Sequence, residues 1–180
     1  QTTGAERGGR LVPQEVPATR VIIVCPLNKA QGLIADHGVG HVVSLLGPDT
    51  PHRSFEGIGC DAHLRLTFHD IVQPADGYSP PTSKDAERLV AFLKNWRRES
   101  PMLIHCWAGI SRSTAAAYTA LCLFRPEATE DDLAWELRAA SPSATPNRLI
   151  VMLADSLMGR EGRMVRAIES IGRGADAFEG

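Results

Sequence analysis

The sequence predicts an α/β fold, in which helices flank a short central sheet of four or five mostly parallel strands. Two observations lead to this prediction. Short apolar runs rich in β-branched residues alternate with longer segments whose apolar residues recur at helical spacing. The last third of the chain contains only segments of the helical kind. We therefore expect a parallel sheet followed by a helical C-terminal third.

One domain is expected over residues 19–172. A chain of 180 residues is long enough to bury one large core, and we find no internal repeat and no second core. Residues 1–18 are rich in Gly, Thr and Pro without periodicity, which indicates a flexible N-terminal tail. Residues 173–180 form a C-terminal tail that we expect to fray.

The first part of the domain contains two buried strands and a short helix. Residues 20–25 are apolar and β-branched, and Pro26 ends the run. Asn28 is placed to cap a helix that runs to about Asp36. Residues 41–46 have the same pattern as the first run, so they predict a second buried strand.

The middle of the domain contains a strand, a loop and an amphipathic helix. Residues 62–68 alternate apolar with polar side chains, which predicts a strand with one wetter face. Residues 72–81 are rich in proline and predict a loop. Thr82 and Asp85 form a capping-box pattern for a helix through Arg98. Its apolar face comprises Ala86, Leu89, Val90, Leu93 and Trp96.

The remaining elements are one strand and four helices. Residues 102–105 predict a further buried strand, and residues 114–124 predict a buried, alanine-rich helix. The later helices are expected from Thr129, which Asp132 helps to cap, to about Ala140, from Asn147 to about Met158, and from Gly162 to about Ile171.

The composition excludes several classes of function. A net charge of −2 argues against nucleic-acid binding, because nucleic-acid-binding domains carry a clear basic excess. The four cysteines lack the paired spacing of a metal site or a disulfide framework, so we expect a reducing, cytoplasmic environment. No apolar run reaches the about 18–20 residues that a membrane span needs. The N-terminal residues lack a signal-peptide core.

Residues 105–114 combine an anion site with a nucleophile. They lie between a predicted strand and a predicted helix, where loop N–H groups and the helix N-terminus attract negative charge. Cys106 follows the strand and Arg112 comes six residues later, an arrangement that suits a thiolate facing a bound phosphate. This spacing alone is a weak signal, but further His, Gly and Ser residues at fixed places around it make the pattern specific.

The stretch from His105 to Ser113 resembles the His-Cys-x-x-Gly-x-Ser-Arg-Ser signature of the cysteine-based protein tyrosine phosphatase superfamily. It is most similar to the small dual-specificity and bacterial tyrosine-phosphatase-like branch. Residues 20–158 follow the family order, and Pro146 with Asn147 resembles the Pro-Asn helix start of dual-specificity enzymes. The resemblance implies the protein-tyrosine-phosphatase-like fold and phosphomonoester hydrolysis through a cysteinyl-phosphate intermediate, chemistry that needs no metal and no cofactor.

The resemblance and the chemistry together give the loop residues their expected roles. Cys106 is expected to be the nucleophile, and Arg112 to hold two phosphate oxygens with its planar fork. Ser113 is expected to hydrogen-bond the sulfur, with a helix-start cap as the alternative. His105 is expected to orient the loop through backbone hydrogen bonds rather than to transfer protons. The expected substrate-binding residues are Trp107, Ala108, Gly109, Ile110, Ser111 and Arg112.

Asp70 is the expected general acid, which protonates the leaving oxygen and then activates water. It lies after a strand on the Pro-rich loop, at the upstream distance where the resembled family keeps its acid. Asp61, Asp76 and Asp85 fit less well, because they precede a strand, lie further along the loop or begin a helix. Residues 70–81 are expected to close over substrate.

The main functional hypothesis is a protein phosphatase that acts on phosphotyrosine and also on phosphoserine or phosphothreonine. Its partner is then a phosphoprotein or a small phosphomonoester. The Trp-Pro-Asp acid loop of larger tyrosine-specific enzymes is not evident, and residues 107–111 lack the lysines of inositide phosphatases. Two alternatives remain open: a rhodanese-like cysteine enzyme and a catalytically inactive phosphate-binding module.

Overall fold

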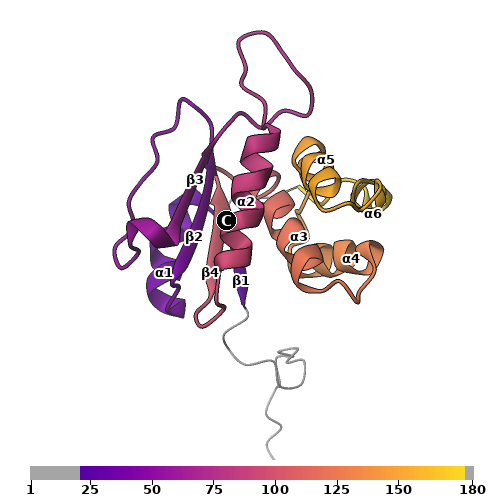
Figure 1. Ribbon diagram of the computed structural model, residues 1–180. Helices are drawn as coiled ribbons and strands as arrows, with labels where there is room; N and C mark the ends of the chain where they lie inside the picture. The colour runs from indigo at the N-terminus through magenta and orange to yellow at the C-terminus, as the bar shows by residue number, and fades with distance from the viewer. Residues whose placement is uncertain (1–20, 177–180) are drawn as a thin grey trace, which may run out of the picture.

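A computed structural model describes residues 21–176, so the predictions for residues 1–20 and 177–180 lie outside the described residues. One sheet is built from four parallel strands (Figure 1): β1 (Ile22–Pro26), β2 (His41–Leu46), β3 (His63–Thr67) and β4 (Met102–Cys106). Their order across the sheet is β1-β4-β2-β3, so the last strand in sequence lies between the first two. The predicted parallel α/β fold is confirmed.

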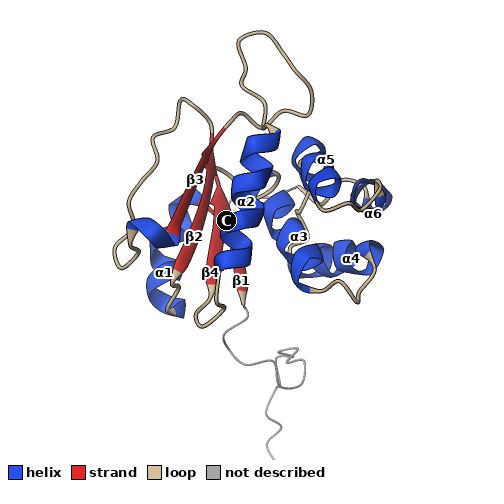
Figure 2. Ribbon diagram, in the orientation of Figure 1, coloured by secondary structure: helices blue, strands red, loops and turns tan. Residues whose placement is uncertain are grey.

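Helices cover both faces of this sheet (Figure 2). One face packs against α1 (Ala30–His37), which follows a 3-10 turn at Leu27–Lys29; a second such turn, Cys60–Ala62, precedes β3. The other face packs against α2 (Ser83–Asn95) and α3 (Arg112–Phe124). The outer helices are α4 (Glu130–Ala140), α5 (Arg148–Leu157) and α6 (Arg163–Ile171), which form the predicted helical C-terminal third.

The central strand β2 shows why the apolar runs form a parallel sheet. Val42 and Leu46 belong to the apolar cluster on the α1 side, whereas Val43 and Leu45 belong to the cluster on the α2 and α3 side. All four side chains are fully buried. A strand covered on both faces needs apolar residues at every position, and this accounts for the continuous run in the sequence.

Two helix starts follow the predicted capping patterns. Thr82 and Asp85 form a reciprocal capping box at α2, in which each side chain accepts a hydrogen bond from the other residue's backbone N–H. The Thr129 hydroxyl accepts a hydrogen bond from the backbone N–H of Asp132, at 3.1 Å, at the start of α4. Both predictions are confirmed, because such caps depend only on residues three apart in the chain.

Two local predictions were wrong, and a third holds only in part. Asn28 does not cap α1: it lies inside the 3-10 turn, and the N-cap position is held by Lys29 without a side-chain hydrogen bond. The helix predicted through Arg98 ends at Asn95, because Trp96 turns into extended backbone and buries its ring beneath the following loop. Finally, the wetter face predicted for β3 holds for Arg65, which is partly exposed, and for Thr67, which is exposed, but not for His63, which is buried.

The described part of the C-terminal tail is attached to the domain. The backbone N–H of Gly174 donates to the Thr145 hydroxyl at 3.1 Å, and that of Ala175 donates to the Pro142 carbonyl at 2.9 Å. Within residues 21–176, no helix combines the length and the apolar character that crossing a membrane requires.

Candidate active site

The candidate site lies at the carboxyl edge of the sheet. Because all four strands are parallel, the segments that follow them meet at this edge. Cys106 is the last residue of β4, a strand in the interior of the sheet, and α3 begins six residues later at Arg112. The five residues between them form the predicted loop, next to the segments that follow β1 and β3.

The Cys106 sulfur is surrounded by donors from its own loop and helix. The backbone N–H of Gly109 donates to Sγ at 3.2 Å, and the Ser113 hydroxyl lies 3.2 Å from Sγ. The side chain is buried, with 3% of its surface exposed. Hydrogen bonds to the charged form of a group favour that form, so this arrangement suits a thiolate. Ser113 thus lies where its expected role requires.

Gly109 gives the loop its curvature. Its φ of +73° is in the left-handed region, and a Cβ at this position would lie 2.7 Å from the backbone of Cys25 and of Pro26. The loop is therefore pressed against the end of β1. The backbone N–H of Leu27 also donates to the Trp107 carbonyl at 3.1 Å, which fixes the same contact.

Ser111 leaves the start of α3 without a side-chain cap. It occupies the N-cap position, but its hydroxyl makes no capping hydrogen bond and instead donates to Asp70 Oδ1 at 2.8 Å. The first N–H groups of a helix lack partners within the helix, and they carry partial positive charge. At α3 these groups consequently remain directed at the loop, where they can bind an anion.

The Arg112 guanidinium is buried and only partly satisfied. Its Nη1 donates to the Phe68 carbonyl at 3.1 Å, which anchors the side chain to the segment after β3. Its Nε is buried and has no hydrogen-bond partner among the described residues. Since buried donors are nearly always paired, an arginine with an unpaired donor beside a nucleophilic loop suits the binding of an oxyanion.

Asp70 is held at the rim of the loop by two donors. The Ser111 hydroxyl and the Asn147 side-chain amide each donate to Asp70 Oδ1 at 2.8 Å. The same amide nitrogen donates to the Ile71 carbonyl at 3.1 Å. Both hydrogen bonds to the carboxyl group converge on one oxygen, and Oδ2 accepts none from the described residues. A proton carried by Asp70 therefore has its place on Oδ2.

Asn147 performs a task that the sequence did not reveal. It caps α5 as expected, because its Oδ1 accepts a hydrogen bond from the Ile150 backbone N–H at 3.0 Å. Its amide nitrogen is then free to hold Asp70. The one signal in the sequence was the resemblance of Pro146 and Asn147 to the helix start of dual-specificity enzymes.

The other candidate carboxylates lie elsewhere. Asp85 is engaged in the capping box of α2, and Asp61 lies in the 3-10 turn before β3. Asp76 is exposed on the same loop as Asp70. Of these four side chains, Asp70 makes the hydrogen bond to the nucleophile loop. The geometry thus ranks Asp70 first among them.

Two hydrogen bonds between His69 and Ser79 close the base of the loop that carries Asp70. The backbone N–H of His69 donates to the Ser79 carbonyl at 2.7 Å, and that of Ser79 donates to His69 Nδ1 at 2.8 Å. The Tyr78 ring stands edge-on to the His69 ring, with centroids 5.0 Å apart. Residues 70–78 therefore project from a fixed base, as expected of a segment that covers a site.

A cavity of about 620 Å³ adjoins the loop. It is bounded by Trp107–Ile110, by the segment from Val24 to Lys29, and by Ser141 and Ser143. Two cationic side chains, Lys29 and Arg53, line it, and no acidic side chain does so among the described residues. Trp107 is 60% exposed beside it. The cavity therefore suits an anionic ligand with an aromatic or apolar part.

The other two buried cysteines, Cys25 and Cys122, differ from Cys106 in their surroundings. Burial, with the nearby Cys106, raises the pKa of Cys25 to about 12. Burial likewise raises the pKa of Cys122 to about 11. Cys60 is exposed on the 3-10 turn before β3, away from the loop. Cys25 and Cys122 therefore stay protonated at neutral pH, which leaves Cys106 as the buried cysteine with loop donors at its sulfur.

Comparison with known proteins adds to this geometry. No protein-family model and no curated protein matches the sequence. Similar solved structures include DUSP15, with 19% identity, a TM-score of 0.55 and coverage of 83% of this chain and 90% of that chain. The human tyrosine phosphatase-like serine/threonine/tyrosine-interacting protein is 16% identical, with a TM-score of 0.60 and coverage of 78% of this chain and 92% of that chain.

A third similar structure is the PTP-2 phosphatase of Cydia pomonella, which is 19% identical and has a TM-score of 0.60. The match covers 77% of this chain and 86% of that chain. These similarities cover most of each chain. The chain therefore has the fold of the dual-specificity and tyrosine phosphatases.

Proposed function

We propose that the protein is a cysteine-dependent phosphomonoesterase that hydrolyses phosphotyrosine, and also phosphoserine and phosphothreonine, through a cysteinyl-phosphate intermediate. One observation carries the proposal. The Cys106 sulfur lies at the base of the loop, with donors from Gly109 and Ser113, while Arg112 and Asp70 stand at the loop's edge. A nucleophile, an oxyanion clamp and an acid thus belong to one loop and the segment that contacts it.

In the first half-reaction the Cys106 thiolate attacks phosphorus, so that an S–P bond forms as the ester P–O bond breaks. Asp70 gives its Oδ2 proton to the leaving oxygen. The loop N–H groups, the start of α3 and the Arg112 guanidinium stabilise the negative charge on the three remaining phosphate oxygens.

In the second half-reaction water attacks the phosphorus of the thiophosphate, and the S–P bond breaks to release inorganic phosphate. Asp70, now ionised, accepts the proton of the attacking water. The Ser113 hydroxyl, 3.2 Å from Sγ, donates to the departing thiolate. Each cycle consumes one phosphomonoester and one water, and it releases one alcohol or phenol and one inorganic phosphate.

The surroundings of the loop support a phosphoprotein substrate. Trp107 offers an exposed ring beside the loop, against which the aromatic or apolar part of a phosphorylated residue can lie. Lys29 and Arg53 supply positive charge in the adjoining cavity. Acidic residues that flank the phosphorylated residue are therefore favoured over basic ones.

The test is hydrolysis of an aryl phosphate and of phosphotyrosine peptides by the purified protein in the presence of EDTA. The parent protein is expected to turn over, and Cys106→Ser to lower kcat by about 10⁴-fold or more. Cys60→Ser, a change at an exposed cysteine, is the matched control and should keep full activity. Asp70→Asn should slow the reaction and remove the basic limb of its pH profile.

A phosphate-binding module without turnover is the second candidate. One of the similar structures is the human tyrosine phosphatase-like serine/threonine/tyrosine-interacting protein, which is named for interaction. If the parent binds a phosphotyrosine peptide but does not hydrolyse it, this second function replaces the first. The rhodanese-like alternative is disfavoured, because helices α4–α6 follow the loop and the similar phosphatase structure DUSP15 covers 83% of this chain.

A further inference from the structure

Three polar side chains form a line across the α1 face of the sheet. They are His63 on β3, Ser44 on β2 and His105 on β4, with 8%, 1% and 0% of their surfaces exposed. Their neighbours on this face are apolar, among them Val42 and Leu103. The strand register pairs Ser44 directly with His105. Polar residues at such positions need partners, and these three supply them for one another.

Hydrogen bonds link these three side chains to one another and to the backbone of Cys106. His63 Nε2 lies 2.7 Å from Ser44 Oγ, and Ser44 Oγ lies 2.6 Å from His105 Nε2. His105 Nδ1 lies 3.1 Å from the Cys106 carbonyl oxygen. We name His63, Ser44 and His105 the polar relay.

The chemistry of these groups fixes the direction of every bond in the polar relay. A carbonyl oxygen only accepts, so His105 Nδ1 carries a proton. In a neutral ring Nε2 is then bare and accepts from the Ser44 hydroxyl. The Ser44 hydroxyl donates its one hydrogen to His105, so its oxygen accepts a hydrogen bond from His63 Nε2–H. All three bonds therefore point toward Cys106.

The surroundings keep both rings neutral. Burial, then the nearby Arg65, lowers the pKa of His63 to about 4, with His105 and His52 acting in the same direction. Burial is also the largest cause that lowers the pKa of His105, and His52, Arg53 and Arg112 add to it, against the hydrogen bond to the Cys106 backbone. The Phe55 ring covers both imidazoles, with centroids 5.5 and 5.6 Å away.

We propose that Ser44 and His63 are positioning residues for Cys106, acting through the ring of His105. The polar relay holds His105 in a single tautomer and orientation, and the ring in turn holds the backbone of the strand end that carries the nucleophile. Aligned hydrogen bonds polarise one another, so the relay presents its positive end to Cys106 and favours the thiolate. The inference deepens the proposed function, because it rests on Cys106 as the nucleophile.

The experiment compares Ser44→Ala, His63→Leu and Ser44→Thr in the full chain. Val42→Ala is the matched control, since it removes buried volume beside His63 on the same strand face but takes away no hydrogen bond of the relay. Nitrogen-15 NMR reads the tautomer of His105, and the pH dependence of iodoacetamide alkylation reads the reactivity of Cys106. Both measurements work in the absence of turnover, so failure of the relay and failure of the phosphatase assignment are distinguishable.

The parent is expected to show His105 protonated at Nδ1. Ser44→Ala should raise the midpoint of Cys106 alkylation by about 0.5–1 pH unit and lower kcat about tenfold with KM little changed. His63→Leu should have a smaller effect, because Ser44 still donates to His105. Ser44→Thr, which retains the hydroxyl, should restore the midpoint. The proposal is overturned by a His105 protonated at Nε2, or by a Val42→Ala midpoint shift equal to that of Ser44→Ala.

Discussion

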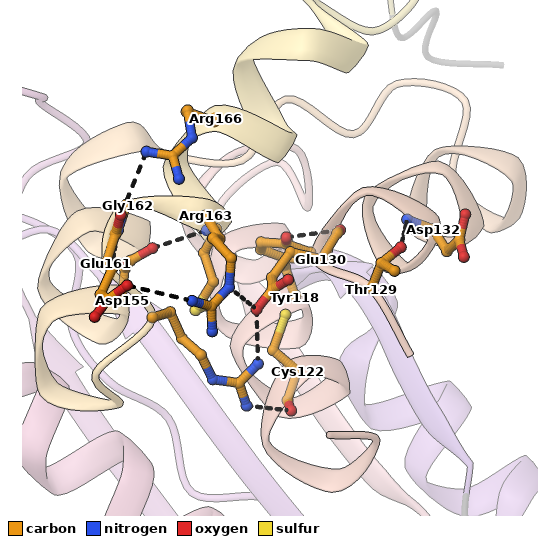
Figure 3. Close-up of polar contacts among 12 residues, drawn as sticks. Tyr118, Cys122, Thr129, Glu130, Asp132, Asp155, Glu161, Gly162, Arg163 and Arg166 are labelled. Atoms are coloured by element: carbon orange, nitrogen blue, oxygen red, sulfur yellow. Dashed lines mark hydrogen bonds and ion pairs between the residues drawn. The ribbon is translucent and has the colours of Figure 1, made fainter. Parts of the chain in front are cut away.

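Two polar clusters lie at opposite ends of α3, and they differ in how completely their groups are paired. One lies at the N-terminal end of α3 and comprises Cys106, Arg112 and Asp70. The other surrounds Tyr118 and Cys122 near the helix C-terminus (Figure 3). There Glu130 Oε1 accepts from Arg160 Nη1 at 3.1 Å and from Arg163 Nε at 3.0 Å. We name Glu130, Arg160 and Arg163 the Glu130 cluster.

The backbone completes the second cluster. Arg160 Nη2 donates to the Cys122 carbonyl at 2.8 Å, and the Tyr118 hydroxyl donates to the Glu130 carbonyl at 2.9 Å. Nearby, the buried Asp155 accepts backbone N–H donors from Gly162 at 2.7 Å and from Met164 at 2.8 Å, which closes the turn from α5 to α6. None of the buried unpaired polar atoms within residues 21–176 belongs to these groups.

The comparison distinguishes polar groups that stabilise the fold from polar groups that can bind a ligand. In the Glu130 cluster the charged groups meet protein partners, and the result is a fixed junction between α3, α4 and the α5–α6 turn. At the loop end, Arg112 retains an unpaired Nε, and α3 starts without a side-chain cap. Groups left without protein partners at a nucleophilic loop are available to a ligand, so changes there should affect catalysis, and changes in the Glu130 cluster should affect stability.

Among the changes that test this comparison, the largest effect is expected from Arg112→Lys. Lysine keeps the charge but lacks the planar fork, so kcat for an aryl phosphate should fall about 10³-fold. The thermal midpoint should change little by comparison, because one hydrogen bond to the Phe68 carbonyl is all that anchors the side chain within the described residues. Steady-state kinetics and circular dichroism measure the two effects. A fall in kcat that is explained by unfolded protein would contradict the separation of effects on catalysis from effects on stability.

Glu130→Gln should give the converse result. Removing the carboxylate charge leaves Arg160 without its counter-ion and Arg163 with only its 3.8 Å pair to Glu161, at a cost of about 2 kcal/mol in the free energy of unfolding. Activity should stay within about twofold of the parent, since the cluster lies away from the loop. Urea unfolding with a parallel kinetic assay checks both values.

The pH dependence of this variant sharpens the test. Burial alone would raise the pKa of Glu130, but hydrogen bonds from its own backbone, from Arg163 and from Arg160 hold the pKa below its ordinary value. A carboxyl group with a lowered folded-state pKa stabilises the protein above its unfolded-state pKa and loses that contribution as the pH falls through the folded-state value. The stability difference between parent and Glu130→Gln should therefore shrink below about pH 4.5. A constant difference down to pH 3 would refute the ionic origin.

Asn147→Ser tests the link between a helix cap and the acid. Serine can still cap α5, but it is too short to hold Asp70, so kcat should fall about tenfold while stability changes by less than about 1 kcal/mol. The basic limb of the pH profile should persist, because Asp70 remains. Asn147→Ala, which removes the cap as well, should cost additional stability. Equal kinetics in the Ser variant and the parent would show that the Asp70 contact is unimportant.

The smallest effect is expected from Arg53→Glu. Reversing one charge in the exposed part of the cavity should raise KM for acidic phosphotyrosine peptides about three- to fivefold and leave kcat unchanged. Basic peptides should bind equally or better, and added salt should reduce the difference. Lys94→Glu, a surface charge reversal at the end of α2, is the control. The same shift in that control would show that net charge, not the cavity, is responsible.

The parts that the sequence predicted are those that depend on neighbouring residues. The capping patterns of Thr82 and Thr129 and the strand–loop–helix around Cys106 each lie within a short stretch of chain. The contact between Asp70 and Asn147 joins residues 77 positions apart, and no local pattern encodes it. His63 was misplaced for the same reason. Its burial follows from the side-by-side pairing of β2 with β3 and β4, which alternation within one strand cannot show.

The strand order has a consequence for how the chain folds as it is synthesised. β1 and β2 emerge first, but they cannot complete a sheet with each other, because β4 lies between them. The N-terminal half therefore waits for residues 102–106 before its central hydrogen bonds can form. The strand that completes the sheet is also the strand that ends in Cys106. A nascent chain thus acquires its loop only when its core closes, and an incomplete chain exposes a cysteine without the Gly109 and Ser113 donors that surround its sulfur in the complete fold.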